Sequence, residues 1–181
     1  LTCNMNAAET LTDQAFVMDA LYFASQRHRD QRRKDQPQSP YVNHLIDVAR
    51  ILSTEGGLSD PHILAAGILH DVLEDTDTTR DEILERFGPE VAAYVDEVSD
   101  DKTLSGDEQK RLQVERAPHV SPGAKLIKLA DKISNVYDLA HSPPPKWSLE
   151  RRAKYIDWCE RVLLALAGAH AGREQKLADT I

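Results

Sequence analysis

Apolar residues recur every three or four positions along nearly the whole chain, and this periodicity restricts the sequence to helical folds. Helix-start signals support the assignment, as in the pairing of Thr79 with Glu82 that is typical of a capping box. No stretch alternates long enough to predict a strand. We expect an all-α fold, a single compact bundle with helices at 11–28, 40–57, 59–75, 79–88, 89–100, 105–117, 121–141 and 148–168.

Length and composition set the domain organisation that we expect. The chain has 181 residues, of which 29% are charged and 41% hydrophobic, typical of one globular domain. We expect residues 1–11 to be a poorly ordered tail and residues 12–181 to form the domain. No apolar run reaches the roughly 20 residues of a membrane span, and two cysteines cannot make a disulfide framework. A reducing, cytoplasmic location is the simplest interpretation.

Charge is unevenly distributed along the sequence. The net charge of −8 argues against nucleic-acid and anionic-membrane partners. Residues 26–34, QRHRDQRRK, form a local basic cluster that includes His28. This cluster could hold a small anion, or it could be no more than a solvated helix end.

The segment AAGILHDVLEDTDTT at 65–79 places ionisable side chains inside an apolar helical pattern. His70 and Asp71 are adjacent, and Glu74 and Asp75 follow one turn later, so residues four apart would share a face. A buried carboxylate without a partner is very costly. A divalent metal ion, with His70 and Asp71 as two ligands, would neutralise this group of charges.

Isolated polar residues in apolar surroundings suggest further ligands. His44 opens the segment 40–57, and Asp131 interrupts a run of core-type residues. Taken alone, His44 could be a capping or core histidine, and Asp131 could pair with a neighbouring lysine. Together with His70 and Asp71 they form a mixed nitrogen and oxygen set, which suits Mn²⁺, Fe²⁺ or Zn²⁺ better than Ca²⁺.

Three stretches together carry a family resemblance: PYVNH at 40–44, AAGILHDVLEDTDTT at 65–79 and AKLIKLADKISNVYDL at 124–139. They resemble the HD-domain hydrolases of the RelA/SpoT type, most closely the small, single-domain alarmone hydrolases of the metazoan SpoT homologue group. HDVLEDT combined with a downstream KLADK and Asn135 is specific, whereas a bare His-Asp pair would indicate only the superfamily. The resemblance covers roughly residues 12–170 and implies an HD-domain helical bundle.

The resemblance also implies roles for the ionisable residues. Glu74 and Asp75 match the acid pair that positions and activates the attacking water in that family. One Mn²⁺ per chain is implied, with other divalent metals as alternatives. The positions that match the four metal ligands of the family are His44, His70, Asp71 and Asp131.

Nucleotide contacts are implied in the same way. Arg33 matches an arginine that lies against the guanine base, Lys34 is placed to meet substrate phosphate, and Asn135 matches a residue that contacts the ribose. The loop RRKDQPQSPYVNH is longer here than in the bifunctional enzymes. Arg32 could therefore take the place of Arg33 on the base.

The last long helical segment offers three more substrate-binding candidates. Trp147, Arg151 and Tyr155 are four residues apart and would share one helix face. They could form a wall of the substrate pocket. Trp147 and Tyr155 could equally belong to the core.

The implied reaction is hydrolysis of the 3′-pyrophosphate of ppGpp or pppGpp, which yields GDP or GTP and pyrophosphate. The predicted partner is thus a small guanosine tetra- or pentaphosphate, with no protein partner. We expect no synthetase activity, because the bifunctional proteins carry that activity in a separate domain. Two alternatives remain: NADPH 2′-phosphatase or another nucleotide phosphohydrolase activity on the same metal site, and a nucleotide sensor that has lost catalysis.

Overall fold

The structure is a computed structural model that describes residues 12–167, and this part of the chain consists of helices and loops without a β-strand. The all-α prediction is confirmed. The predicted tail at 1–11 and the end of the predicted domain at 168–181 lie outside the described residues. The elements are α1 Asp13–Arg27, α2 Val42–Arg50, the π-helical η1 Ile51–Glu55, α3 Pro61–Leu69, α4 Val72–Asp75, α5 Arg80–Val98, α6 Gly106–Arg116, the 3₁₀ helix η2 Ala117–His119, α7 Pro122–His141 and α8 Leu149–Leu166.

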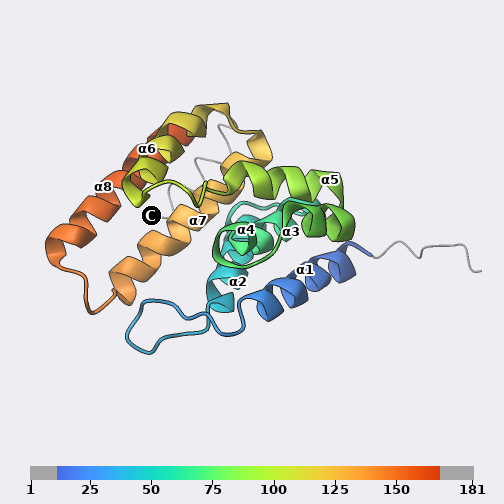
Figure 1. Cartoon of the computed structure of the whole chain (residues 1–181), viewed down its shortest axis with the longest axis horizontal. Coiled ribbons are helices and arrows are strands. Elements are labelled where there is room, and N and C mark those ends of the chain that lie inside the picture. Colours follow the sequence, from blue (N-terminus) through green and yellow to red (C-terminus); the bar gives the residue numbers. More distant parts are fainter. Residues whose placement is uncertain (1–11, 168–181) are drawn as a thin grey trace, which may run out of the picture.

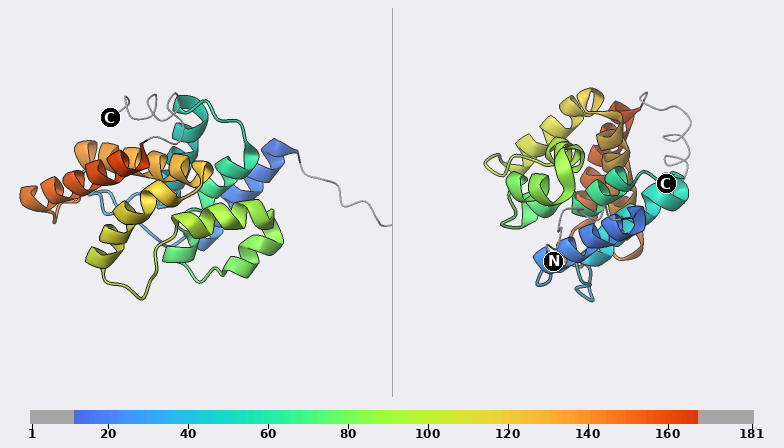
Figure 2. Two further views of the ribbon diagram at one scale, coloured as in Figure 1. Left: turned by 90° about the horizontal axis from the view of Figure 1, so that it is seen from above. Right: turned by 90° about the vertical axis from the view of Figure 1, so that its right-hand side faces the viewer.

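The long helix α7 lies between two groups of helices (Figures 1 and 2). On one side it packs against α2, α3 and α5, and α1 covers α3. On the other side it packs against α8, which in turn contacts α6. The core is continuous across both groups, because buried side chains such as Leu45, Ile127 and Val162 belong to one cluster. Side chains that point from α2, α3 and α7 toward their common junction therefore meet inside the fold.

Local sequence signals explain where most helices begin. The Thr79 hydroxyl accepts a hydrogen bond from the Glu82 amide at 3.2 Å, and the Glu82 carboxylate accepts one from the Thr79 amide at 2.9 Å. This is the predicted capping box. Inside α5, Gly88 has a φ of 82°, a left-handed conformation that favours glycine, and the helix kinks there. The predicted boundary between the segments 79–88 and 89–100 is thus visible as a kink.

The prediction of one continuous helix over 59–75 is wrong near its C-terminal end. α3 stops at Leu69, and α4 starts again at Val72. At the break, Asp71 has φ −97° and ψ −4°, at the edge of the right-handed helical region. His70 and Asp71, the two residues between α3 and α4, line the same cavity.

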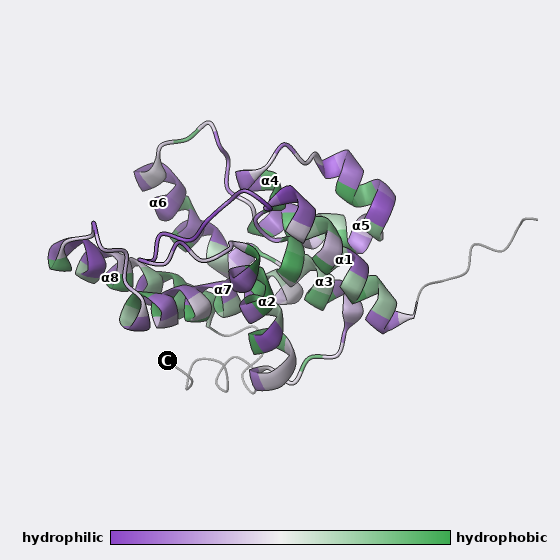
Figure 3. Ribbon diagram, turned by 90° about the horizontal axis from the view of Figure 1, so that it is seen from below, coloured by the Kyte–Doolittle hydropathy of each residue, from purple (hydrophilic) through white to green (hydrophobic). Residues whose placement is uncertain are grey.

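The loop between α1 and α2 is strongly hydrophilic (Figure 3). Its own hydrogen bonds fix its course. Arg32 and Pro40 form an isolated β-bridge, and the Asp35 carboxylate accepts hydrogen bonds from the amide and hydroxyl of Ser39 at 2.9 and 2.6 Å. Arg33 of this loop is bound to α7 through Asn135 and Asp138. No helix within residues 12–167 is long and apolar enough to cross a membrane.

Candidate active site

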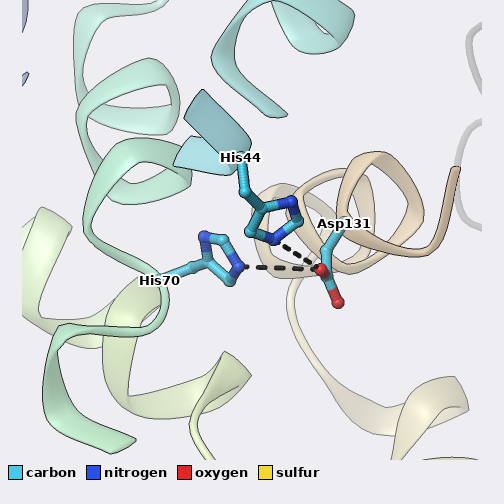
Figure 4. A group of neighbouring side chains, drawn as sticks. All are labelled: His44, His70 and Asp131. Atoms are coloured by element: carbon cyan, nitrogen blue, oxygen red, sulfur yellow. Dashed lines mark ion pairs between the residues drawn. The ribbon is translucent and has the colours of Figure 1, made fainter. Parts of the chain in front are cut away.

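Three side chains from three different helices converge at the junction of α2, α3 and α7. His44 comes from α2, His70 ends α3, and Asp131 comes from the middle of α7 (Figure 4). One donor atom of each lies within 4.8 Å of the others. The Asp131 Oδ1 atom is 3.2 Å from His44 Nε2 and 3.7 Å from His70 Nε2. These residues are three of the four predicted ligands, and their arrangement can hold a metal ion.

Asp71, the fourth predicted ligand, lies beside this group. Its Oδ2 atom is 3.0 Å from His70 Nε2 and 3.8 Å from His44 Nε2. The ring orientation of His70 is fixed from behind, since His70 Nδ1 donates to the Gly67 carbonyl at 2.8 Å. His70 Nε2 is buried and faces the Asp71 and Asp131 carboxylates, but it makes no hydrogen bond of regular geometry with either. A metal ion would supply the partner that this nitrogen lacks.

The electrostatics of the cluster also favour a bound cation. Burial alone would lower the pKa of His70, but the Asp71 and Asp131 carboxylates outweigh it and raise this pKa well above its usual value. Burial likewise opposes ionisation of Asp71, yet the positive charge of His70 holds the pKa of Asp71 below its usual value. The cluster therefore attracts positive charge, and its mixed donor set fits a divalent metal ion.

A cavity of about 160 Å³ opens onto these residues, and Glu74 lines it. The Glu74 carboxylate accepts a hydrogen bond from the Asp100 amide at 2.7 Å. Burial and the nearby negative charges of Asp71 and Asp100 raise the pKa of Glu74 to about 7. A carboxyl group with such a pKa can exchange a proton near neutral pH, which is the property of a general base or acid.

Two buried lysines form the far wall of the small cavity. Lys132 Nζ lies 2.8 Å from Asp131 Oδ2 and 4.6 Å from the centre of the Trp158 ring. Lys128 Nζ donates to the Val98 carbonyl at 2.9 Å. Burial and the charge of Lys132 lower the pKa of Lys128. The small cavity thus combines the acidic side chains of the candidate metal site with cationic groups suited to an anionic substrate.

A second cavity, of about 420 Å³, adjoins the first, and Tyr41 and Asn135 line both. Its size falls in the range of small-molecule sites. The predicted base-binding residue Arg33 lines it and is held in place by Asn135 Oδ1 at 3.0 Å and Asp138 Oδ2 at 2.7 Å. Lys34 lines the same cavity and is exposed. Arg32 also lines it, but its guanidinium is bound to the carbonyls of Arg29 and Gln31.

The predicted acid pair is divided between the cavities, because Asp75 lines the larger one. Asp75 Oδ2 accepts a hydrogen bond from Gln31 Nε2 at 2.7 Å, and Gln31 Oε1 lies 2.5 Å from His28 Nδ1. His28 is buried and stacks on Tyr41 with ring centres 5.0 Å apart. His28, which the sequence groups with the basic cluster at 26–34, is therefore packed inside the fold and is not part of a solvated helix end. The periodicity of α1 could have indicated this, since His28 follows Ala24 by one turn.

The three candidates on the last segment lie close together but have different surroundings, and Trp147 precedes α8, so the three do not share one helix face as expected. Trp147 and Tyr155 line the larger cavity, with ring centres 5.5 Å apart. Tyr155 also packs on Trp158 at 5.3 Å, so it belongs to both the cavity wall and the core. Arg151 is exposed and is not among the lining side chains; its guanidinium lies 4.4 Å from the centre of the Trp147 ring. Arg151 therefore contacts a residue of the cavity wall but does not line the cavity itself.

Comparison with known proteins identifies the family. The sequence profile described as "HD domain" matches residues 20–156. The chain belongs to the HD-domain family. Its histidine and aspartate cluster accordingly marks a divalent metal site.

Relatives of this HD domain cover nearly its whole length. It is 50% identical over 166 residues to the human protein named guanosine-3′,5′-bis(diphosphate) 3′-pyrophosphohydrolase MESH1, covering 92% of this chain and 93% of that protein. The Drosophila melanogaster protein of the same name is 48% identical over 165 residues, covering 91% and 92%. A solved structure titled "A metazoan ortholog of SpoT hydrolyzes ppGpp and plays a role in starvation responses" aligns with a TM-score of 0.88 and 46% identity, covering 96% of both chains.

The sequence did not single out several residues that the structure places in the site of this HD domain. Tyr41 donates a hydrogen bond from its hydroxyl to Asp71 Oδ2 at 2.5 Å, and Asp138 pairs with Arg33. Spacing could have suggested both, because Tyr41 lies three residues before His44 and Asp138 three residues after Asn135. Helical neighbours of this kind share a face.

Proposed function

We propose that this HD domain hydrolyses the 3′-pyrophosphate of guanosine 3′,5′-bis(diphosphate) or its pentaphosphate with Mn²⁺ as the metal. The proposal is supported by a cluster of candidate metal ligands at a small cavity that adjoins a nucleotide-sized one, in a chain half identical to proteins named for this activity. The acid pair and all four expected ligands are present, which argues against a sensor that has lost catalysis. We assign the domain to residues 12–181, as the sequence predicts.

The metal would be held by the two histidines and two aspartates of the cluster: His44, His70, Asp71 and Asp131. When bound, a divalent cation there supplies positive charge that polarises a phosphoryl oxygen and lowers the pKa of water. Nitrogen and oxygen donors together are compatible with Mn²⁺.

The surrounding residues then handle the proton and the substrate. Glu74, in the small cavity, would take the proton of the attacking water, and Lys128 and Lys132 would balance phosphate charge. Asp75, oriented by Gln31, would position that water or the substrate from the side of the larger cavity. In this arrangement the 3′-pyrophosphate of the substrate would occupy the small cavity, and its nucleoside would occupy the larger one.

The function is tested by identifying products. Purified protein is incubated with Mn²⁺ and, in separate reactions, ppGpp, NADPH and a panel of nucleoside phosphates, and the products are separated by ion-exchange chromatography. We expect GDP and pyrophosphate from ppGpp, abolished by a chelator and restored by added Mn²⁺. If orthophosphate and NADH were formed from NADPH far faster than GDP from ppGpp, the metal site would stand but the proposed substrate would be wrong.

Arg33 provides a test of the nucleotide cavity. Its guanidinium lies 5.7 Å from the centre of the Tyr41 ring, in a place where a purine could stack on it. Stacking of a base is worth about 1–3 kcal/mol, so Arg33→Ala is expected to raise KM for ppGpp about tenfold with a smaller change in kcat. The matched control is Arg32→Ala, measured in the same steady-state assay. A larger rise in KM for Arg32→Ala would assign the base contact to Arg32.

A further inference from the structure

His44 is connected to a chain of hydrogen bonds that leads away from both cavities. His44 Nδ1 lies 3.1 Å from Ser134 Oγ, and Ser134 Oγ donates to Asp47 Oδ2 at 2.7 Å. His44 and Ser134 are almost fully buried, at 2% and 1% exposure. The second oxygen of the same carboxylate, Asp47 Oδ1, accepts from Arg50 Nε at 2.9 Å. Ser134 lies inside the stretch 124–139 that carries the family resemblance, but the sequence alone assigns no role to Ser134 or to Asp47.

The direction of these hydrogen bonds follows from the number of available protons. A serine hydroxyl has one proton, and an ionised carboxylate can only accept. The Ser134 proton is therefore used by Asp47, and the Ser134 oxygen must accept at its other contact. His44 Nδ1 has to carry the proton that it donates to Ser134. A neutral imidazole with a proton on Nδ1 has its lone pair on Nε2.

We propose that Asp47 and Ser134 are positioning residues that hold His44 as the Nδ1–H tautomer, so that its Nε2 lone pair points at the metal. The inference rests on the metal site of the proposed function. His44 Nε2 is the atom that faces Asp131 Oδ1 and Asp71 Oδ2. A proton on this nitrogen would have to leave before a metal could bind there. The hydrogen-bond relay from Asp47 through Ser134 to His44 opposes a proton at Nε2, whereas the facing carboxylates favour one until a cation takes its place.

The two histidines of the cluster are thus oriented by different means. His70 Nδ1 donates to the carbonyl of Gly67 in its own helix, so the backbone fixes its tautomer. His44 depends on two side chains, one from α2 and one from α7. Partners that orient a metal-binding histidine commonly change metal affinity about 10- to 100-fold when they are mutated. His44 is accordingly the ligand whose orientation a conservative substitution can disturb.

The experiment compares four variants by direct titration of the metal-free protein with Mn²⁺. Ser134→Ala leaves His44 Nδ1 without its acceptor. Asp47→Ala frees the Ser134 hydroxyl to donate to Nδ1 and so favours the wrong tautomer. For both we expect the dissociation constant for Mn²⁺ to rise about 10- to 100-fold. Asp47→Asn retains an acceptor oxygen for Ser134, so its affinity for Mn²⁺ should be closer to that of the wild type than to that of Asp47→Ala.

The matched control for this series is Arg50→Ala, which removes the other partner of the Asp47 carboxylate. The Arg50 side chain is 52% exposed, and its loss leaves the contact between Asp47 and Ser134 in place. We expect Arg50→Ala to bind Mn²⁺ with wild-type affinity. Should Ser134→Ala fail to fold, Asp47→Ala tests the same relay from the partly exposed end.

A second readout observes the tautomer itself. Long-range ¹H–¹⁵N NMR spectra of the metal-free protein, at a pH at which the imidazole is neutral, distinguish a proton on Nδ1 from one on Nε2. We expect Nδ1–H for His44 in the wild type and a gain of Nε2–H in Ser134→Ala and Asp47→Ala. A wild-type ring protonated on Nε2, or unchanged Mn²⁺ affinity in both variants, would overturn the proposal. If the wild type bound no Mn²⁺, the metal site itself would be wrong, and the tautomer measurement would still decide on the relay.

Discussion

Replacing Glu74 by Gln is expected to lower kcat for ppGpp about 10²- to 10⁴-fold, the usual contribution of a general acid or base. The amide oxygen of Gln can still accept the hydrogen bond from the Asp100 amide, so the local fold should be retained. Only the capacity to take a proton is lost. Steady-state kinetics measure the effect, and direct titration with Mn²⁺ is expected to show metal affinity close to that of the wild type.

The pH profile separates this role from a structural one. Burial and the charges of Asp71 and Asp100 raise the pKa of Glu74 to about 7. A base is active when deprotonated, so the wild-type rate should increase as the pH rises through the pKa of this carboxyl, which a bound cation would move lower. The Glu74→Gln enzyme should lack that limb of the profile.

Asp75→Asn is the matched neighbour, because Asp75 accepts from Gln31 in the larger cavity and does not line the small one. We expect a smaller loss of kcat for Asp75→Asn than for Glu74→Gln, and complete loss in the double variant, with Mn²⁺ still bound. Turnover that survived the double substitution would show that neither carboxylate handles the water.

Asp131→Asn is expected to abolish activity and also to destabilise the metal-free protein by about 3–5 kcal/mol. Asp131 contributes one oxygen to the metal cluster and the other to the ion pair with Lys132. Lys132 is buried, at 5% exposure, so loss of its counter-ion leaves an uncompensated charge in the core. Chemical denaturation of the chelator-treated protein measures the stability, and the ppGpp assay measures the activity.

A second substitution distinguishes the two consequences. Lys132→Met in the Asp131→Asn background removes the unpaired ammonium and keeps an unbranched side chain against Trp158. This double variant should regain much of the lost stability and remain inactive. If the double variant were as unstable as Asp131→Asn alone, the loss of stability would not come from the charge of Lys132.

The fold class and the candidate ligands could be predicted from the sequence because they depend on local patterns. Helical periodicity and capping residues such as Thr79 and Ser105 act over a few residues, and the structure contains both caps. The cluster of His44, His70 and Asp131 followed from polar residues in apolar surroundings together with the family resemblance. Their meeting in space is a consequence of packing α2 and α3 against α7.

Features that depend on contacts between distant segments could not be predicted in the same way. The helix break before Val72 does not follow from helix propensity, since Leu69 and Val72 belong to one apolar pattern. Likewise, the interpretation of His28 depended on whether the ring faces Tyr41 or solvent. Similarly, the position of Arg151 outside the cavity depends on how α8 is rotated about its axis, which the sequence pattern does not specify.

The three-helix origin of the metal cluster also has a consequence for how the molecule assembles. His44 and Asp131 are far apart in the sequence, so no fragment that lacks α2 or α7 contains the complete cluster. The cation should therefore associate with the finished fold and not with the unfolded chain, and mass action then adds the binding free energy to the unfolding free energy. The ion would link α2, α3 and α7, which are distant in the sequence. The midpoint temperature of thermal unfolding should therefore rise with Mn²⁺ concentration.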